Sequence, residues 1–310
     1  MSAFHSDLWF GRFLPSFSFG PKLVAFIRKQ TRRGALPVLE DIVVEDVDVP
    51  ASGASPAVSL RLYRPKTPKG PGPALYWMHG GGFVIGSPEQ DQSVILELVR
   101  ALGLTVAAVR YRLAPEHPAP AAVEDAYAGL KWLFAEASRL SVDPARIAIG
   151  GVSAGGGLAA TLAFVAQDRH EVRPAFQLLI YPMLDDRTVT RTDLDTRHVR
   201  VWSPQSNAWA WSVYLGQAPG SPQASSYAAA ARREDVSGLP PAWIGVGTLD
   251  LFHDEDVAFA QRLKTSGVPC ELHVVPGAFH GFDALFPRAG VSKGFRQEWI
   301  RVLRTALRPA

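Results

Sequence analysis

The chain has one cysteine, Cys270, among its 310 residues. A single thiol excludes an intrachain disulfide and any metal site that needs several cysteines. It suits a reducing compartment, so we expect a cytoplasmic protein. Long apolar runs are missing too, and none approaches the roughly 18 residues that a membrane-spanning helix needs. Because no Lys or Arg precedes the apolar N-terminal part and no clear small-residue cleavage site follows it, we expect no signal peptide.

Charge of one sign is also scarce. The 32 Lys and Arg residues and the 29 Asp and Glu residues give a net charge of +3, and the surplus is spread along the chain. The densest basic cluster, Arg28–Lys29 with Arg32–Arg33, is short, and we interpret it as a solvated helix end. We therefore expect no nucleic-acid partner. No spacing of His, Asp and Glu resembles a metal site, so no metal is predicted.

The pattern of apolar residues from about residue 40 onward predicts an α/β protein. Short strand-like runs alternate with amphipathic helical patterns, which is typical of a mainly parallel sheet covered by helices. Ile42–Val49 and Ala57–Tyr63 are polar at every second residue, so we expect half-buried edge strands there. Buried central strands are predicted at six apolar runs: Ala74–Met78, Thr105–Val109, Arg146–Ile149, Phe176–Ile180, Ala242–Val246 and Glu271–Val275. Helices are predicted over 89–102, 121–139, 154–168, 254–266 and 291–307.

Two aromatic-rich segments fall outside this alternation. Residues 1–40 precede the predicted sheet, and residues 184–238 interrupt it with Trp202, Trp209 and Trp211 among others. An insertion of this length in a compact domain usually has a function, such as forming a lid or one wall of a binding site. The alternative is an insertion without a functional role, but exposed aromatic side chains without a partner surface are disfavoured. We therefore expect the insertion to act as a lid.

The segment Gly151–Gly155 reads G-V-S-A-G and fits the G-x-S-x-G nucleophile elbow. A strand-like run leads in and a helical pattern leads out, which is the context that the motif demands. A serine on so sharp a turn adopts strained backbone angles, which small neighbours tolerate. The helix that follows points its free N–H groups and its positive dipole end toward the serine. The alternative is a glycine-rich turn that only packs a helix on a strand. Because the complete strand–turn–helix context is present, we instead predict Ser153 as a nucleophile.

The segment His79–Phe83 reads H-G-G-G-F directly after a predicted strand and matches an oxyanion-hole motif. Acyl transfer builds negative charge on a carbonyl oxygen, which rigid backbone N–H groups stabilise. Glycines let the backbone approach a substrate closely, and we predict the N–H groups of Gly81, Gly82 and Ala154 as the donors. A phosphate loop is the competing interpretation, but no Gly-Lys-Ser/Thr or G-x-G-x-x-G follows. We interpret His79 as a brace for the loop.

A general base is expected downstream of Ser153, because this kind of elbow carries its partners in the order Ser, Asp or Glu, His. Five of the eight histidines lie too early in the chain, and His273 lies inside a predicted strand. His280 lies in a glycine-flanked loop that can bring an imidazole to the serine, whereas His253 opens a predicted helix. We favour His280, and His253 stays as the alternative.

Asp250 follows the predicted strand Ala242–Val246, at the carboxyl end where α/β sheets place their chemistry. Its carboxylate would orient the imidazole and stabilise the imidazolium. Asp254, Glu255 and Asp256 are rivals, but a run of acids that opens a helix is better explained by N-terminal capping and the helix dipole. We predict Asp250 as the acid, with Asp254 as the fallback.

Two further groups have structural interpretations. The segment Tyr111–Glu116, which reads Y-R-L-A-P-E, is expected to brace the loop after the fourth strand through ion pairs and hydrogen bonds. Asp125 is expected to be a partly buried helix residue tied to a nearby loop. An apolar substrate pocket is expected as well, because acyl chains offer only surface to bury. Candidate residues for its wall are Phe13, Phe83, Trp202, Trp209 and Trp211.

The motifs at 79–83, 111–116, 153–156 and 280–282 together resemble the hormone-sensitive-lipase-like family of α/β-hydrolases, whose bacterial members are carboxylesterases. The resemblance covers the chain from about residue 40 to its end. It implies an α/β-hydrolase fold, with a mostly parallel eight-stranded sheet flanked by helices and a helical cap. We expect the cap to consist of residues 1–40 and 184–225, and the hydrolase core to consist of residues 41–183 and 226–310.

The resemblance also implies an activity. We expect a serine carboxylesterase that hydrolyses short to medium acyl esters through an acyl-enzyme intermediate, with a small-molecule substrate and no cofactor. Family members often dimerise through the edge of the last strand, so a homodimer of that kind is expected. The rivals are an amidase or deacetylase of small N-acyl groups and a non-catalytic receptor for a small apolar ligand. Such receptors typically lose the triad histidine, so His280 argues against that rival.

Two positions depart from the family pattern. Val152 stands where the family usually has Asp or Thr, which removes a polar contact near the nucleophile. Leu251 stands where the family motif D-P-L-x-D-E has proline, so we expect the acid turn to be shaped differently.

Overall fold

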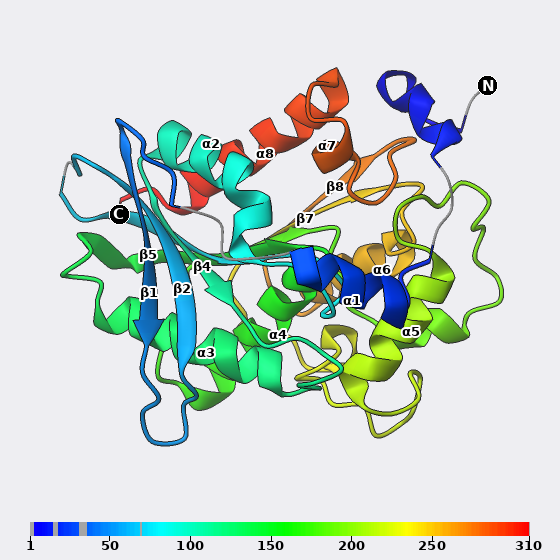
Figure 1. The fold of residues 1–310 in the computed structure, drawn as a ribbon, viewed down its shortest axis with the longest axis horizontal. Helices are drawn as coiled ribbons and strands as arrows, with labels where there is room; N and C mark the ends of the chain where they lie inside the picture. The colour runs from blue at the N-terminus through cyan, green and yellow to red at the C-terminus, as the bar shows by residue number, and fades with distance from the viewer. Residues whose placement is uncertain (1–2, 15–17, 31–35, 69, 310) are drawn as a thin grey trace.

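A computed structural model describes residues 3–14, 18–30, 36–68 and 70–309, which form one eight-stranded sheet with helices on both faces (Figure 1). The strands are β1 (Ile42–Val49), β2 (Val58–Pro65), β3 (Gly72–Met78), β4 (Thr105–Arg110), β5 (Val142–Val152), β6 (Phe176–Ile180), β7 (Ala242–Gly247) and β8 (Cys270–Val275). Their order in the sheet is β1-β2-β4-β3-β5-β6-β7-β8. Strands β3 to β8 pair in parallel, and β2 is antiparallel to both of its neighbours. This is the α/β-hydrolase fold that the sequence predicts.

Helices connect the strands and fill the two segments that the alternation left open. The α-helices are α1 (Pro21–Gln30), α2 (Gln92–Leu102), α3 (Ala121–Ala135), α4 (Ala154–Arg169), α5 (Pro204–Leu215), α6 (His253–Thr265), α7 (Phe282–Leu285) and α8 (Gly290–Ala306). The 3₁₀ helices are η1 (Ser6–Phe13), η2 (Pro88–Asp91), η3 (Asp186–Thr190) and η4 (Ala230–Arg232). No helix in these described ranges is both long and apolar enough to cross a bilayer.

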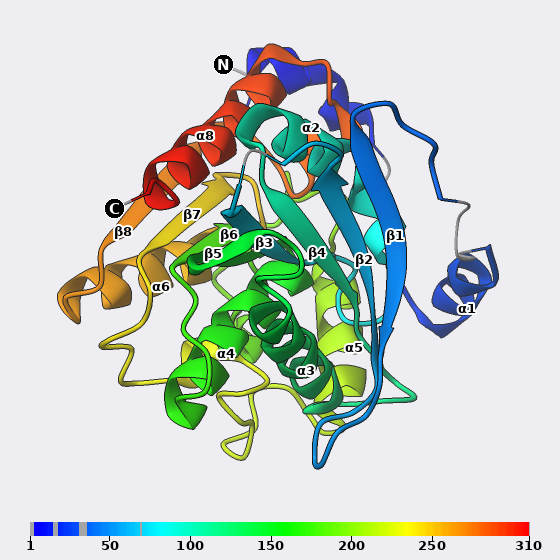
Figure 2. The same cartoon turned by 90° about the vertical axis from the view of Figure 1, so that its left-hand side faces the viewer.

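The central strands are buried on both faces because successive side chains of a strand point to opposite sides. In β3, Ala74, Tyr76 and Met78 pack in one core with α3, α4 and α6. Leu75 and Trp77 pack in a second core with α2 and α8. Figure 2 shows the sheet between these two helical layers. Runs of apolar residues without polar alternation are what such strands require.

Two predictions about the sheet edges are wrong. Strand β2 is an inner strand between β1 and β4, although its sequence alternates. Its polar Arg61 is nearly inaccessible to solvent, and its guanidinium pairs with Asp46 at 2.7 Å and Glu89 at 3.2 Å. A buried charge is tolerated when it is paired and hydrogen-bonded in this way.

Strand β8, which we predicted as a central strand, is instead the sheet edge beyond β7, and most of its residues are partly exposed. An edge strand keeps backbone groups free to pair with another strand. The expected pairing of two copies along β8 stays a prediction.

The predicted helices are all present, with shifts of a few residues at their ends. The pattern over 89–102 divides into η2 and α2, and the one over 121–139 ends as α3 at Ala135. Arg28 and Lys29 lie in the last turn of α1, as expected, whereas Arg32 and Arg33 lie outside the described residues. Arg28 is more than solvated, because its guanidinium donates to the Val84 carbonyl at 2.7 Å and pairs with Glu116 at 2.6 Å.

The residues before β1 contact the insertion between β6 and β7. The Phe19 N–H donates to the Ser206 hydroxyl at 2.8 Å, and the Phe19 ring contacts Trp202 with 5.5 Å between centroids. Arg200 donates to the Gly11 carbonyl at 3.2 Å. Segments nearly two hundred residues apart in the chain therefore meet over the same end of the sheet. The division into cap and core at the residue numbers given above stays a prediction.

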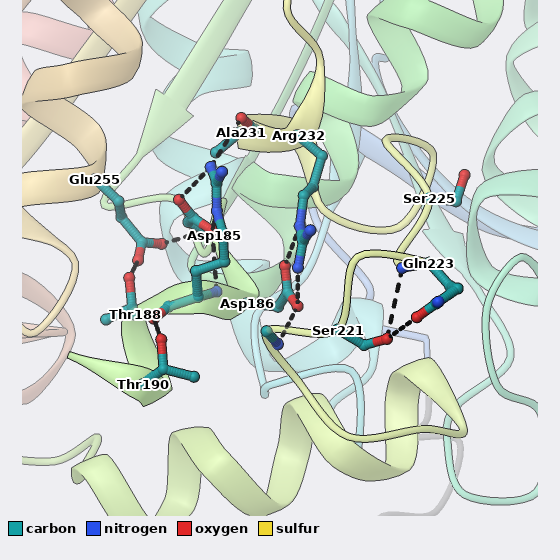
Figure 3. Close-up of polar contacts among 12 residues, drawn as sticks. Asp185, Asp186, Thr188, Thr190, Ser221, Gln223, Ser225, Ala231, Arg232 and Glu255 are labelled. Carbon is teal, nitrogen blue, oxygen red and sulfur yellow. Dashed lines mark hydrogen bonds and ion pairs between the residues drawn. The ribbon is translucent and has the colours of Figure 1, made fainter.

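Two buried acids tie the insertion to the core (Figure 3). The Glu255 carboxylate of α6 accepts the backbone N–H of Leu184 at 2.7 Å and also accepts the Thr188 hydroxyl. Asp186, which is fully buried, pairs with Arg232 at 2.8 Å and accepts the Gly220 N–H at 2.6 Å. Glu255 thus fixes the start of the insertion to α6, and the buried Asp186–Arg232 ion pair joins the two ends of the insertion to each other.

The loop Tyr111–Glu116, which is expected to brace the loop after the fourth strand, also supports the glycine loop at 79–83, a contact that the sequence does not predict. The Tyr111 hydroxyl donates to the His79 carbonyl at 2.8 Å, and the Ala114 N–H donates to the Phe83 carbonyl at 2.9 Å. Asp125 of α3, 1% exposed, holds this loop by accepting the backbone N–H and the guanidinium of Arg112 at 2.8 Å each. The expectation that Asp125 ties a helix to a nearby loop is confirmed.

Asp125→Ala is therefore expected to lower both stability and turnover. The variant loses charge-assisted bonds of a buried carboxylate and leaves the Arg112 N–H without its acceptor, which costs about 2 kcal/mol. Thermal unfolding followed by circular dichroism should show Tm lower by about 4 °C or more. Asp41→Ala is the matched control, because its ion pair with Arg100 is half exposed and such pairs contribute little. Equal Tm values for the two variants would contradict the bracing role.

Candidate active site

Ser153 lies on the turn between β5 and α4 with φ at +56° and ψ at −122°. This left-handed backbone is strained for a residue with a side chain, as the sequence predicts for an elbow. The turn requires glycine at positions 151 and 155, because a Cβ at either position would overlap the carbonyl oxygen of Met78 on the neighbouring strand. This backbone conformation directs the Ser153 hydroxyl away from β5 and places it at the N-terminus of α4.

Ser153, His280 and Asp250 form one hydrogen-bonded chain. The Nε2 atom of His280 lies 2.9 Å from Oγ of Ser153, and its Nδ1 atom lies 2.8 Å from Oδ2 of Asp250. The three residues are 5–7% exposed. Asp250 lies in the turn after β7 and His280 in the loop after β8, so parallel strands bring both to the same edge of the sheet.

The imidazole of His280 is held from several sides. Tyr181 and Phe252 contact it edge to face, with centroids 4.8 and 5.1 Å away. Oδ1 of Asp250 accepts the Phe252 N–H at 3.0 Å, which fixes the carboxylate. With the carboxylate on Nδ1–H, the free lone pair of Nε2 faces the serine hydroxyl, so the chain can withdraw the serine proton.

The rival residues lie elsewhere. His253 is the first residue of α6, and its Nδ1 lies 2.9 Å from Asp254 rather than near Ser153. Asp254 also pairs with Arg191 at 2.8 Å. Residues 254–256 do lie in the first turn of α6, but none of their side chains caps this helix. The capping interpretation is therefore wrong, because Glu255 turns to the insertion and Asp256 is buried.

The glycine loop after β3 approaches Ser153. Gly81 and Gly82 have φ values of +121° and +61°. A Cβ at Gly82 would overlap the Trp202 ring, and one at Gly80 would lie 3.4 Å from the Ser153 Cβ. No hydrogen bond within the described segments takes the N–H of Gly81 or Gly82. The N–H of Ala154, at the first position of α4, has no intrahelical acceptor either.

His79 braces this loop as a neutral imidazole. Its Nδ1 lies 2.9 Å from the Gly80 carbonyl, and its ring stacks on Tyr111 with 4.2 Å between centroids. Burial lowers the pKa of His79 to about 4. The His79 side chain therefore carries no charge at neutral pH. It takes no part in the hydrogen-bonded chain of Ser153, His280 and Asp250, which we call the relay.

A cavity of about 450 Å³ opens beside Ser153 and His280. Its size suits a small organic ligand. Its apolar wall is formed by Phe19, Ile85, Val94, Val152, Val201, Trp202, Leu285 and Trp299 among others. Val152, the departure from the family pattern, thus contributes an apolar surface to the cavity next to the nucleophile.

Of the five aromatic residues predicted for the pocket wall, Trp202 lines this cavity and the other four lie elsewhere. Phe83 is buried and stacks on Tyr214 with 3.8 Å between centroids. Trp211 packs in the core against that pair, and Trp209 is half-buried at its margin. Phe13 is 66% exposed on η1. Aromatic content alone could not distinguish core from wall, because both bury apolar surface.

Some residues of the site were missed from sequence. Tyr181 follows β6 and contacts His280, Asp91 ends η2, and Asp283 lies in α7. Both acids line the cavity. The signal for Asp283 was its position directly after the H-G-F motif, three residues from the imidazole. Among the residues that the structure places, no cluster of His, Cys, Asp and Glu side chains is arranged to hold a metal ion.

Asp256 is a buried carboxyl close to the relay. It is inaccessible to solvent, and neither of its oxygens has a hydrogen-bond partner in the described part of the chain. Burial, with the nearby charges of Glu255 and Asp250, raises the pKa of Asp256 well above its usual range. The folded protein therefore keeps this group protonated where the unfolded chain ionises it, so its contribution to stability falls as pH rises above about 4.

Asp256→Asn removes this ionisation while keeping the side-chain shape. The Tm of the variant relative to the original protein should rise as the pH is raised from about 4 to about 7, because the original protein alone loses stability over this range. Differential scanning calorimetry across this range tests the sign. A Tm difference that stays constant or shrinks with rising pH would contradict the assignment of a neutral buried carboxyl.

A family model described as the alpha/beta hydrolase fold matches residues 75–284. The chain therefore belongs to the α/β-hydrolase fold family, in agreement with the hormone-sensitive-lipase-like motifs described above.

Individual relatives share most of the chain. It is 34% identical over 274 residues to the carboxylic ester hydrolase LipN of Mycobacterium tuberculosis, covering 86% of this chain and 72% of LipN. It is 34% identical over 232 residues to an ethyl acetate hydrolase of Pseudomonas putida, covering 72% and 70%.

Among solved structures, a bacterial heroin esterase superposes with a TM-score of 0.88 at 36% identity, over 99% of both chains. An esterase of Pyrobaculum calidifontis superposes with a TM-score of 0.76 at 33% identity, over 92% of this chain and 90% of its own.

Proposed function

We propose that the protein is a serine carboxylesterase for short to medium acyl esters. The observation that carries the proposal is the unbroken hydrogen-bond chain from Ser153 through His280 to Asp250 beside an apolar cavity. The similarity to proteins named carboxylic ester hydrolase and esterase supports the same reaction class. The chemistry follows from the residues present.

In the acylation half-reaction, Nε2 of His280 takes the proton of the Ser153 hydroxyl as the oxygen attacks the ester carbonyl carbon. The carbonyl π electrons move to the oxygen and give a tetrahedral oxyanion. When the C–O bond to the alcohol breaks, the His280 imidazolium returns its proton to the leaving oxygen. Asp250 stabilises the imidazolium between these steps and keeps its tautomer fixed.

In the deacylation half-reaction, water enters from the cavity and gives a proton to the same imidazole. The hydroxide attacks the acyl carbon, and the Ser153 oxygen leaves with the proton that His280 returns. The acid product is released, and the hydrogen-bond chain is restored.

The negative charge of both tetrahedral intermediates would be stabilised by the N–H groups of Gly81, Gly82 and Ala154. The positive φ values of the two glycines and the start of α4 at Ala154 support this role. The partial positive charge at the N-terminus of α4 acts in the same direction. Donors fixed in place before the reaction stabilise charge best, because they need no reorganisation.

The substrate range follows from the cavity. A volume of about 450 Å³ with a largely apolar wall binds acyl chains in proportion to the surface they bury, at roughly 0.8 kcal/mol for each methylene. Chains beyond the length of the cavity gain nothing further, so activity is expected to fall for long acyl groups.

Ser153→Ala is expected to lower kcat/KM for p-nitrophenyl esters by about 10⁴-fold or more, because the nucleophile of the acyl-enzyme is lost. A series of p-nitrophenyl esters from acetate to palmitate, assayed with the original chain and the variant, measures both activity and chain-length preference. Equal rates for the two proteins would overturn the mechanism.

The same series distinguishes the rival functions. Faster hydrolysis of matched p-nitroanilides than of esters would favour an amidase, whose triad chemistry is identical. Tight binding of apolar ligands by a protein that cleaves no ester would favour a receptor of the same fold.

His280→Ala should abolish most turnover, because no other base lies in the relay. His253→Ala is the matched control, since His253 pairs with Asp254 outside the relay, and it should keep most of the activity. Both variants are compared by kcat/KM for p-nitrophenyl butyrate. Loss of activity in the second variant alone would assign the base to His253.

A further inference from the structure

Three acidic side chains line the cavity that holds Ser153 and His280, and one of them, Glu97, pairs with Arg296. The other two are Asp91 and Asp283. Asp91 ends η2, and Asp283 lies in α7, three residues after the imidazole of the relay. Asp283 is 4% exposed, and Asp91 is partly buried. Neither belongs to the hydrogen-bond chain of the proposed mechanism, so their place in the substrate cavity needs a separate explanation.

Each of these carboxyls is held by a neutral donor. The indole N–H of Trp77 donates to Asp91 at 2.8 Å, and the Tyr181 hydroxyl donates to Asp283 at 2.9 Å. Across the segments described, neither acid forms an ion pair. Burial raises the pKa of Asp91 to about 7, with a further contribution from the charge of Asp283. Burial also raises the pKa of Asp283. An isolated charge in such a place is costly unless a partner neutralises it.

The arginine that lines the same cavity does not supply that partner. The Arg296 guanidinium pairs with Glu97 at 3.4 Å and donates to the Pro287 carbonyl at 2.7 Å. It also donates to the backbone carbonyl of Asp283 at 3.1 Å, rather than to its carboxylate. Against the effect of burial, the charge of Arg296 lowers the pKa of Asp283, as does that of His280. The ion pair of Arg296 is nevertheless with Glu97, and no arginine or lysine in the described segments forms an ion pair with Asp91 or Asp283.

The remaining wall suits an organic cation. The aromatic side chains of Phe19, Tyr181, Trp202 and Trp299 line the cavity, and aromatic faces attract ammonium groups.

We propose that the cavity binds the ammonium group of an amino-alcohol ester, with Asp91 and Asp283 as its counter-ions. The inference rests on the proposed esterase function and adds its substrate class. When the ammonium enters, the two carboxyls together release one proton to solvent, and the single negative charge that they then share is neutralised by the cation. Aromatic rings on the other walls complete a cage around the alkyl groups on nitrogen.

The position of the acids places the ammonium on the alcohol half of the ester. His280 must reach the leaving oxygen to protonate it, so the alcohol departs on the imidazole side of the nucleophile. Asp283 follows His280 by three residues on that side, and both line the cavity. The acyl half then occupies the apolar remainder of the site.

A matched pair of esters tests the proposal. 2-(Trimethylammonio)ethyl acetate and 3,3-dimethylbutyl acetate have the same shape and differ in charge. Acetate release from each gives the ratio of kcat/KM values, cationic over neutral. Because hydrogen bonds and ion contacts to charged groups are the strong ones, we expect a ratio of about tenfold or more. Homologues with three or four carbons between oxygen and nitrogen locate the best spacing.

The variants Asp91→Asn, Asp283→Asn and the double variant should bring the ratio close to one. The neutral ester reports the active fraction of each variant, so the ratio is independent of any loss of folded protein. Glu171→Gln is the matched control. It removes one negative charge just beyond the far end of α4, about 24 Å from the elbow, and should leave the ratio unchanged. Tetramethylammonium should inhibit neutral-ester hydrolysis competitively in the original chain and at least tenfold more weakly in the double variant.

Several outcomes would overturn the proposal. One is a ratio near one in the original chain, and another is a high ratio that survives in the double variant. A second matched pair, methyl 4-(trimethylammonio)butanoate and methyl 5,5-dimethylhexanoate, carries the charge on the acyl half. If the cationic-over-neutral ratio of kcat/KM were larger for this pair than for the acetate pair, the cation would be assigned to the acyl half instead. Hydrolysis of the neutral ester with no charge preference overturns this inference alone, whereas no hydrolysis of any ester overturns the proposed function as well.

Discussion

The hydrogen-bond chain between a serine on an elbow, an imidazole on a loop and a carboxylate on a turn is the interaction on which the rest of this structure depends. Ser153 and His280 are 127 residues apart, yet their reacting atoms lie 2.9 Å from each other. Parallel strands that end at a common edge of the sheet bring these distant residues together through short loops. The order of β5, β7 and β8, and the strained backbone at the nucleophile, are the means by which the fold does so.

A second set of contacts holds the glycine loop in position beside the hydrogen-bonded residues Ser153, His280 and Asp250. The three glycines of the loop 79–83 have no side chains to pack, so the loop is held by the stacked rings of His79 and Phe83 at its ends and by hydrogen bonds from neighbouring segments. Tyr111 and Ala114 hold its carbonyl groups, and Asp125 holds their loop in turn. Arg28 adds a contact from the N-terminal segment to the Val84 carbonyl. The donors proposed for the oxyanion are therefore fixed by residues that never touch a substrate.

The sequence predicted most of the fold because its apolar runs are long, regular and separated by clear turns. The elbow, the glycine loop and the loop histidine were predicted because each motif carries its own local geometry. What could not be predicted depends on neighbours that are remote in the chain. The polar alternation of β2 indicated an edge, but the ion pairs of Arg61 with Asp46 and Glu89 allow an inner position. Whether Phe83 or Trp202 would face the cavity depended on packing against α5 and Phe19, which no periodicity reveals.

The attachment of the insertion through Glu255 has a consequence for protein engineering. This glutamate lies in the first turn of α6, five residues after Asp250, and it accepts the backbone N–H groups of Leu184 and Asp185. Any chimera that exchanges the insertion for that of another hydrolase must keep the junction through Thr188 and the Asp186–Arg232 pair. A crossover placed inside that junction would disturb the first turn of α6, which lies close to Asp250, whereas an exchange of residues between 191 and 216 replaces Val201 and Trp202 in the cavity wall and leaves the junction intact.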